Sequence, residues 1–279
     1  MTWTLQNISN YGTSTPAVAR TAVQGKDIVQ FLGGTDVQKA QAIEALFALQ
    51  KRLIRCVSIH EGIDALVRKA GEDLKSGKLN FQPDDRVVRP PSIPDLEGVA
   101  ESFLQGAKLA ISAATRLTEP FYGEHFGHKL NKLEAWAEKK FGQEHAYVGF
   151  AKGWQPWVKE ILALRDAIDH PRKGPGGTLH IQNFTVEFRP NEAALLAPMW
   201  WLEGSPRIFI ADSMAHIIEG VIRLQEDLLG SMFHVRKQFP FAVLEEIPPD
   251  KRDPQCPIRL RVGLNAEMTK KLSEADDRP

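Results

Sequence analysis

The sequence predicts a mainly α-helical protein, a bundle of four long helices with a small strand-rich excursion and short C-terminal strands. Apolar residues recur at spacings of three and four over four long stretches, which is the period of an amphipathic helix. Prolines and glycines separate these stretches, and alternating, β-branched segments occur only near 178–203 and after 240. Helices that each carry one apolar face hide those faces most simply by packing together.

The first two long helices are predicted at 36 to about 70 and at 94–117. Thr35 or Asp36 is a suitable N-cap for the first of them. The segment 77–92 carries several prolines and is predicted to be the connecting loop.

The third long helix is predicted at 144–169, with a break or kink at Pro156 because proline has no backbone N–H. A shorter helix is predicted at 128–141. The fourth long helix falls within 206–235, where the helical period returns.

Strands are predicted at 178–188 and 199–201, and again at 241–247 and 258–264, where short apolar stretches lie between prolines. These elements suggest three segments. An N-terminal arm covers 1–34, a helical domain with the strand-rich excursion near 178–203 covers 35–240, and C-terminal strands with a solvated tail cover 241–279.

The composition indicates an ordinary soluble globular protein. Hydrophobic residues make up 43% and charged residues 25% of the 279 residues. Lysine plus arginine equals aspartate plus glutamate at 35 each, so no overall field attracts polyanions and nucleic-acid binding requires a local basic patch. Cys56 and Cys256 have no disulfide or zinc spacing, and there is no leader or membrane-spanning run, so we expect a cytoplasmic protein without a membrane partner.

The stretch "ALRDAIDHPRKGPGGTLHI", residues 163–181, contains the strongest candidate site. Arg165 lies about 40° from the centre of the apolar face of its helix, so its stem can pack while its guanidinium reaches out. Asp166 lies four residues before His170, a spacing that lets the carboxylate hold the imidazole. Arg172 and Lys173 add positive charge, which predicts a local anion site.

Arg165 and His170 lie about 140° apart on an ideal helix, so they would not touch if the helix ran straight through. Because a proline follows His170 and disfavours the helical conformation there, the histidine is expected to be free to turn or to face a partner chain. A structural alternative remains open, since basic residues and a following proline are also usual at the end of a helix.

Other candidate sites are weaker. Glu124, His125 and His128 are possible metal ligands, but the sequence places no further ligands beside them, so neither a metal nor a cofactor is predicted. The pairs Trp154 with Trp157 and Trp200 with Trp201 suit base stacking, a buried core or a dimer face equally well.

In residues 165–170 an arginine is followed by a polar residue and, after a short spacer, by a histidine. This pattern resembles the Arg-x(4–6)-His signature of the HEPN superfamily. HEPN stands for higher eukaryotes and prokaryotes nucleotide-binding. The signature falls on the third of four predicted long helices, and the resemblance covers roughly residues 36–235 as architecture. It implies a HEPN-like helical domain that forms a homodimer with two motifs facing one cleft.

The resemblance also implies a metal-independent endoribonuclease acting on RNA, as in toxins of toxin–antitoxin pairs and antiviral effectors, with an antitoxin or sensor protein as a possible partner. His170 would be the general acid or base, Arg165 would hold the scissile phosphate and Asp166 would orient the pair. Arg172 and Lys173 would bind RNA phosphates. The 2′-hydroxyl would attack and leave a 2′,3′-cyclic phosphate.

The sequence departs from one subgroup of this family, because Arg172 stands where that subgroup has a tyrosine two residues after the histidine. The strand-rich excursion is also longer than a minimal HEPN domain requires. A second function therefore stays open, that of a catalytically inert HEPN-like dimeric interaction module in which the same pair only ends the helix.

Overall fold

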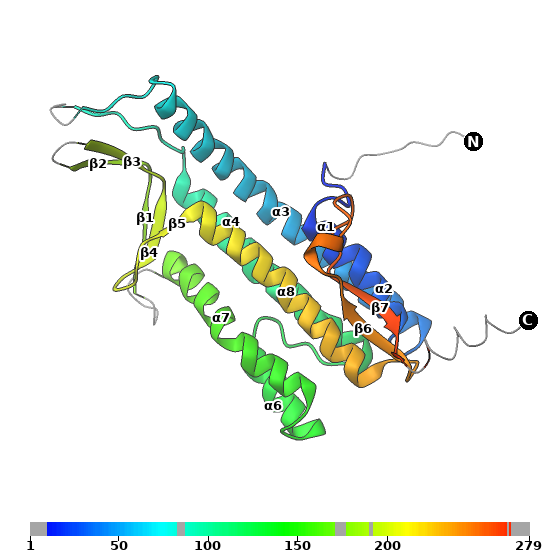
Figure 1. Ribbon diagram of the computed structural model, residues 1–279. Helices are drawn as coiled ribbons and strands as arrows, with labels where there is room; N and C mark the ends of the chain where they lie inside the picture. Colours follow the sequence, from blue (N-terminus) through cyan, green and yellow to red (C-terminus); the bar gives the residue numbers. More distant parts are fainter. Residues whose placement is uncertain (1–9, 83–86, 171–176, 190–191, 267, 269–279) are drawn as a thin grey trace, which may run out of the picture. The chain divides into compact units, whose positions relative to one another are not determined.

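The computed structural model describes residues 10–82, 87–170, 177–189, 192–266 and 268, and Figure 1 shows their course along the chain. The fold is mainly helical, with small antiparallel sheets. The chain divides into two compact units. Unit 1 contains Met1–Ile54, Ala110–Gln155 and Val221–Pro279, and unit 2 contains Arg55–Leu109 and Pro156–Gly220.

The four predicted long helices are present, and each contributes residues to both units. They are α3 (Asp36–Lys75), α4 (Leu96–Thr115), α7 (Ala146–Asp169) and α8 (Ile210–Arg236). Thr35 caps α3: its hydroxyl accepts from the Gln38 N–H at 3.2 Å, and its own N–H donates to the Gln38 side chain at 3.0 Å. The helix α7 continues through Pro156, so the predicted break is absent, and the alternative of a kink there stays a prediction.

The N-terminal segment is not an arm throughout, which corrects the prediction for residues 16–30. It forms α1 (Pro16–Val18), a π-helix (Ala19–Val23) and α2 (Gln24–Gln30). The prediction failed because the Ser, Thr, Asn and Gly content of 1–34 hid a short apolar pattern that ends in Ile28 and Val29, both fully buried. The remaining short helices are η2 (Arg116–Thr118), α5 (Glu119–Tyr122), α6 (Leu130–Phe141) and η3 (Pro249–Lys251).

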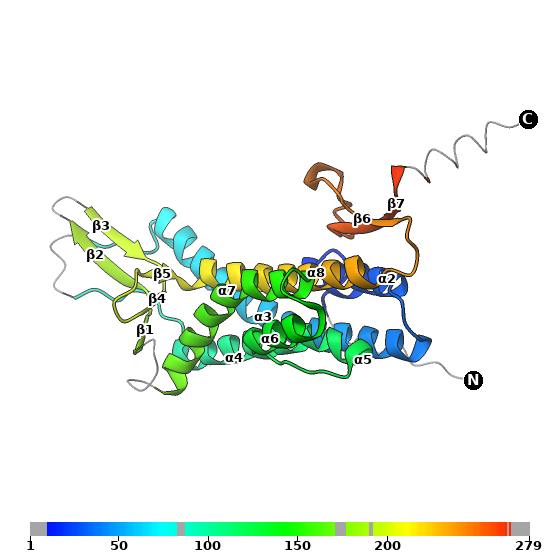
Figure 2. The same ribbon diagram turned by 90° about the horizontal axis from the view of Figure 1, so that it is seen from below.

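In unit 1 the helices pack closely around buried leucines. Leu46, Leu49 and Leu53 of α3 are almost completely buried. A Cβ at Gly25 of α2 would come within 2.9 Å of the Leu46 side chain, so the glycine allows α2 to approach α3 at this point. The predicted C-terminal strands are confirmed as the hairpin β6 (Ala242–Glu246) and β7 (Leu260–Leu264), which lies beside α2 (Figure 1 and Figure 2).

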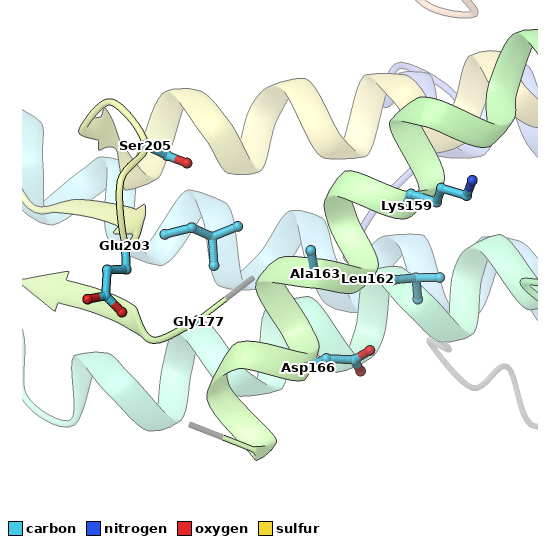
Figure 3. Close-up of a pocket in the computed structure, with 8 residues that line it drawn as sticks. Lys159, Leu162, Ala163, Asp166, Gly177, Glu203 and Ser205 are labelled. Atoms are coloured by element: carbon cyan, nitrogen blue, oxygen red, sulfur yellow. The ribbon is translucent and has the colours of Figure 1, made fainter. Parts of the chain in front are cut away.

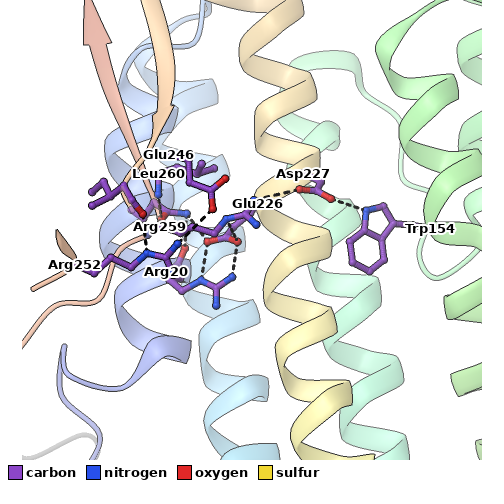
Figure 4. Close-up of polar contacts among 10 residues, drawn as sticks. Arg20, Trp154, Glu226, Asp227, Glu246, Arg252, Arg259 and Leu260 are labelled. Carbon is purple, nitrogen blue, oxygen red and sulfur yellow. Dashed lines mark hydrogen bonds and ion pairs between the residues drawn. The ribbon is translucent and has the colours of Figure 1, made fainter. Parts of the chain in front are cut away.

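One fully buried carboxylate, that of Glu226 on α8, joins the N-terminal and C-terminal parts of unit 1 (Figure 4). Arg20 of the π-helix donates to it through Nε and Nη2 at 2.8 and 2.6 Å. The Gln24 side-chain amide donates to it at 2.9 Å, and Arg259 lies 3.1 Å away. The Gln24 side-chain amide oxygen Oε1 in turn accepts from the backbone N–H groups of Arg259 and Leu260, which fixes the start of β7.

In unit 2 the buried side chains include Phe103 of α4 and Trp200, whose rings lie 6.5 Å apart. Trp157 of α7 packs directly on Gly220 of α8, where a Cβ would overlap the indole ring. Close packing of this kind at a glycine fixes the approach of two helices.

The strand-rich excursion of unit 2 consists of two small sheets. The first has the order β1–β4–β5, from β1 (Leu179–Gln182), β4 (Met199–Leu202) and β5 (Ile208–Phe209). The second pairs β2 (Thr185–Arg189) with β3 (Glu192–Leu196). The predicted strands at 178–188 and 199–201 are confirmed. The fourth long helix begins only at Ile210, because residues 208–209 pair with β4.

Candidate functional site

The predicted motif lies at the end of α7, in unit 2. The helix ends at Asp169, and the His170 N–H still donates to the Asp166 carbonyl at 2.9 Å. A helix is therefore regular from Arg165 to the residue before the proline, and the side chains of Arg165 and His170 leave it about 140° apart. Within the described residues no hydrogen bond or ion pair joins them.

Three side chains of the same chain hold the Arg165 guanidinium. Its Nε donates to the Gln105 amide oxygen at 3.1 Å, and Nη1 donates to the Asp166 carboxylate at 3.0 Å. Nη2 makes an ion pair with Asp169, one helical turn away. The Arg165 side chain is only 20% exposed, so these contacts are partly shielded from water. One positive charge is thus matched with two negative charges.

His170 is exposed, and its side chain has no hydrogen-bond or ion-pair partner among the residues that the structure describes. Asp166 directs its carboxylate to Arg165, so it does not orient the imidazole as the spacing of four had suggested. Arg172 and Lys173, the predicted phosphate-binding residues, lie outside the described residues. Of the five predicted site residues, the structure brings together Arg165 and Asp166.

A pocket of about 770 Å³ opens beside the motif (Figure 3). Lys159, Leu162, Ala163 and Asp166 line it from one side of α7, and the opposite wall is the turn after β4, with Glu203 and Ser205. Its charged groups are one lysine and two carboxylates, a set that disfavours an anionic ligand.

A second cavity, of about 600 Å³, lies in unit 1 beside the Glu226 network. Asp227, Ser231 and His234 of α8 line it together with β6. The Trp154 indole N–H donates to the Asp227 carboxylate at 3.0 Å (Figure 4). Burial raises the pKa of Asp227, an effect that the hydrogen bond from Trp154 and the charge of Arg259 oppose.

Neither a metal cluster nor a reactive Cys56 thiol is found among the described residues. Nowhere among them do three His, Cys, Asp or Glu side chains form a possible metal site. Burial raises the pKa of Cys56 to about 12, so its thiol stays protonated and unreactive near neutral pH.

Sequence reasoning missed two of the three groups that hold Arg165. Asp169 could have been found, because it follows Arg165 by four residues, the spacing at which helical side chains meet. Gln105 lies 60 positions earlier on α4, and only the packing of α4 and α7 brings it to the guanidinium.

Comparison of the chain with known proteins gives no match to a family model, to a curated protein or to a solved structure. No helix within the described residues is both long enough and apolar enough to cross a membrane.

Proposed function

We propose that this chain is a HEPN-like helical protein that works as a dimeric interaction module and does not cleave RNA. The observation that carries the proposal is the closed polar cluster around Arg165. The Arg165 guanidinium already bonds Gln105, Asp166 and Asp169, so it links α4 to the last turn of α7.

The charges of this cluster oppose phosphate binding. A phosphate at Arg165 would have to replace at least one carboxylate and would still lie near the other. Two like charges about 4 Å apart near a protein surface repel by roughly 4 kcal/mol. The neighbouring pocket offers no compensation, because Glu203 adds a further negative charge and Lys159 a single positive one.

A partner surface is supported by large apolar side chains on the strands of unit 2. Phe188 is 43%, Ile208 45% and Phe209 43% exposed. Exposed aromatic and aliphatic side chains on strands are typical of protein contacts.

The second candidate is the metal-independent endoribonuclease, and one observation favours it. His170 is exposed at the helix end with no side-chain partner among the described residues, and the basic pair Arg172 and Lys173 begins two residues later in the sequence. In this mechanism His170 would take the proton of the 2′-hydroxyl, and Arg165 would have to leave its carboxylates to hold the phosphate.

Two measurements on the same variants distinguish the candidates. RNA cleavage in EDTA is compared for the wild type, Arg165→Ala and His170→Ala, and the free energy of unfolding is measured for each. For a structural Arg165, we expect no cleavage above the level of a buffer blank. We also expect Arg165→Ala to lower stability by about 2 kcal/mol, since it removes several charge-assisted hydrogen bonds.

Arg68→Ala is the matched control, because Arg68 pairs with Asp64 at the same spacing of four but is 69% exposed. Such an exposed pair contributes about 0.5 kcal/mol. Cleavage by the wild type that both Arg165→Ala and His170→Ala abolish, with stability unchanged, would reject the interaction module in favour of the nuclease.

A further inference from the structure

Three aromatic rings in unit 1 form a three-sided cage around a lysine ammonium. Tyr122 ends α5, while Trp136 and Phe141 belong to α6. Their ring centroids lie 5.3–5.9 Å apart, at interplanar angles of 71° for Tyr122 with Trp136, 72° for Tyr122 with Phe141 and 87° for Trp136 with Phe141. Rings at near right angles present several π faces and edges to one place.

The local sequence explains how the cage forms. Gly123 (φ 71°) and Gly142 (φ 95°) adopt positive φ values directly after Tyr122 and Phe141, so each helix ends at its aromatic residue. Trp136 lies one turn before Lys140, which places the lysine side chain over the same face of α6.

The Lys140 ammonium lies over all three rings. Its Nζ is 5.4 Å from the centroid of Tyr122, 5.2 Å from that of Trp136 and 5.6 Å from that of Phe141, all within the range of a cation–π contact. Within the described residues Lys140 has no carboxylate or hydrogen-bond partner. The rings alone therefore hold this cation.

The cage offers little to a hydrogen-bonding cation. The Tyr122 hydroxyl is already bonded to the Tyr147 hydroxyl at 2.9 Å, and burial raises the pKa of Tyr147, so the Tyr147 hydroxyl offers no negative charge. The Arg236 guanidinium also lies 5.1 Å from the Tyr122 centroid and repels every cation, so no net charge attraction favours entry. A ligand must therefore gain its binding energy from direct ring contact and must have no N–H donors to satisfy. A quaternary ammonium ion meets both conditions.

We infer that Tyr122, Trp136 and Phe141 form a binding site for a quaternary ammonium group, which Lys140 occupies in the free protein. The group can belong to a small molecule such as choline or to a trimethylated lysine of a partner protein. The site lies in unit 1 and does not depend on any role of Arg165.

The test uses Lys140→Met, which keeps the length of the side chain, removes its charge and lies at an exposed helical position. Choline is titrated while its N-methyl proton signal is followed by NMR, because surrounding rings shift that signal upfield. We expect saturation in Lys140→Met with a dissociation constant of ~1 mM, and binding roughly tenfold weaker in the wild type.

Lys139→Met is the matched control, since it removes the neighbouring exposed lysine without opening the cage, and it should behave as the wild type. Adding Phe141→Leu to Lys140→Met should abolish binding, and a thermal melt confirms that this variant is folded. A peptide with trimethyllysine forms the second arm, and the tighter ligand of the two identifies the source of the group.

The neutral carbon isostere of choline, dimethylbutanol, tests whether the charge is recognised. Equal shifts with dimethylbutanol and choline would show a merely apolar surface and overturn the inference. So would a Lys140→Met titration with both choline and the peptide that shows no more saturation than Lys139→Met.

Discussion

Replacing Glu226 by glutamine should destabilise the protein more than any exposed charge substitution. Three donor nitrogens, from Arg20 and Gln24, lie 2.6–2.9 Å from its two carboxylate oxygens, and the Arg259 guanidinium forms an ion pair with it at 3.1 Å. A glutamine keeps one acceptor oxygen and places an NH₂ group against the remaining donors. The change removes the negative charge of Glu226 from the buried guanidinium of Arg20, whose side chain is 7% exposed.

Removing one partner of a buried ion pair costs about 3–5 kcal/mol. For a chain of this size, that loss corresponds to a decrease of roughly 10 °C in the melting temperature. Urea unfolding followed by far-ultraviolet circular dichroism measures the free energy. Hydrogen exchange at the Arg259 and Leu260 amides, which donate to Gln24, reports whether the start of β7 loosens.

Glu245→Gln is the matched control. Glu245 pairs with Arg261 at 2.9 Å within the same hairpin, but the two side chains are 38% and 64% exposed. We expect a cost below about 1 kcal/mol. A Glu226→Gln variant that loses no more stability than Glu245→Gln, with unchanged exchange at β7, would refute the view that Glu226 ties the chain ends together.

Two further predictions concern α8. Gly220→Ala should lower the free energy of unfolding by about 1–3 kcal/mol, because its methyl group would overlap the Trp157 ring. Gly230→Ala is the control: the added Cβ meets no neighbouring atom within 4 Å, so the free energy of unfolding should stay the same or rise by up to about 1 kcal/mol. Urea unfolding midpoints measure both effects, and equal effects would contradict the packing of Trp157 on Gly220. The raised pKa of Asp227 means that the folded state binds its proton more tightly than the unfolded state does, so the stability from this group is present below pH 3.8 and is lost as pH rises through the higher folded pKa. The unfolding free energy of the wild type relative to Asp227→Asn should therefore decrease as the pH rises above 3.8 and through the raised folded pKa. A difference that does not change with pH would show that the proton is not linked to folding.

The sequence was sufficient where the cause of a structure is local. Apolar spacing predicted the four long helices, and Thr35 was identified as a possible cap of α3. Alternating, β-branched residues predicted the strand region at 178–188, and short apolar stretches between prolines predicted the two C-terminal strands. Only the structure shows that these two strands pair with each other.

The candidate site was found only in part for the same reason. The Arg165 motif and the end of α7 before a proline are local features and could be read from the spacing. The hydrogen-bond partners of the Arg165 guanidinium could not all be predicted from the sequence, because Gln105 reaches it from another helix. The negative charges of Asp166 and Asp169 decide whether Arg165 can bind a phosphate. They favour the interaction module over the nuclease.

The sequence by itself thus determined which segments are helices, which are strands and where a basic motif stands at a helix end. Only the tertiary structure decided which charges meet. Glu226 lies more than 200 positions after Arg20 and 33 positions before Arg259, yet the three side chains meet. Likewise, Tyr122 contacts Trp136 and Phe141 from a separate helix. Hydrogen-bond and ring contacts act over a few ångströms in space, whereas residue order fixes proximity only within a helical turn or a strand pair.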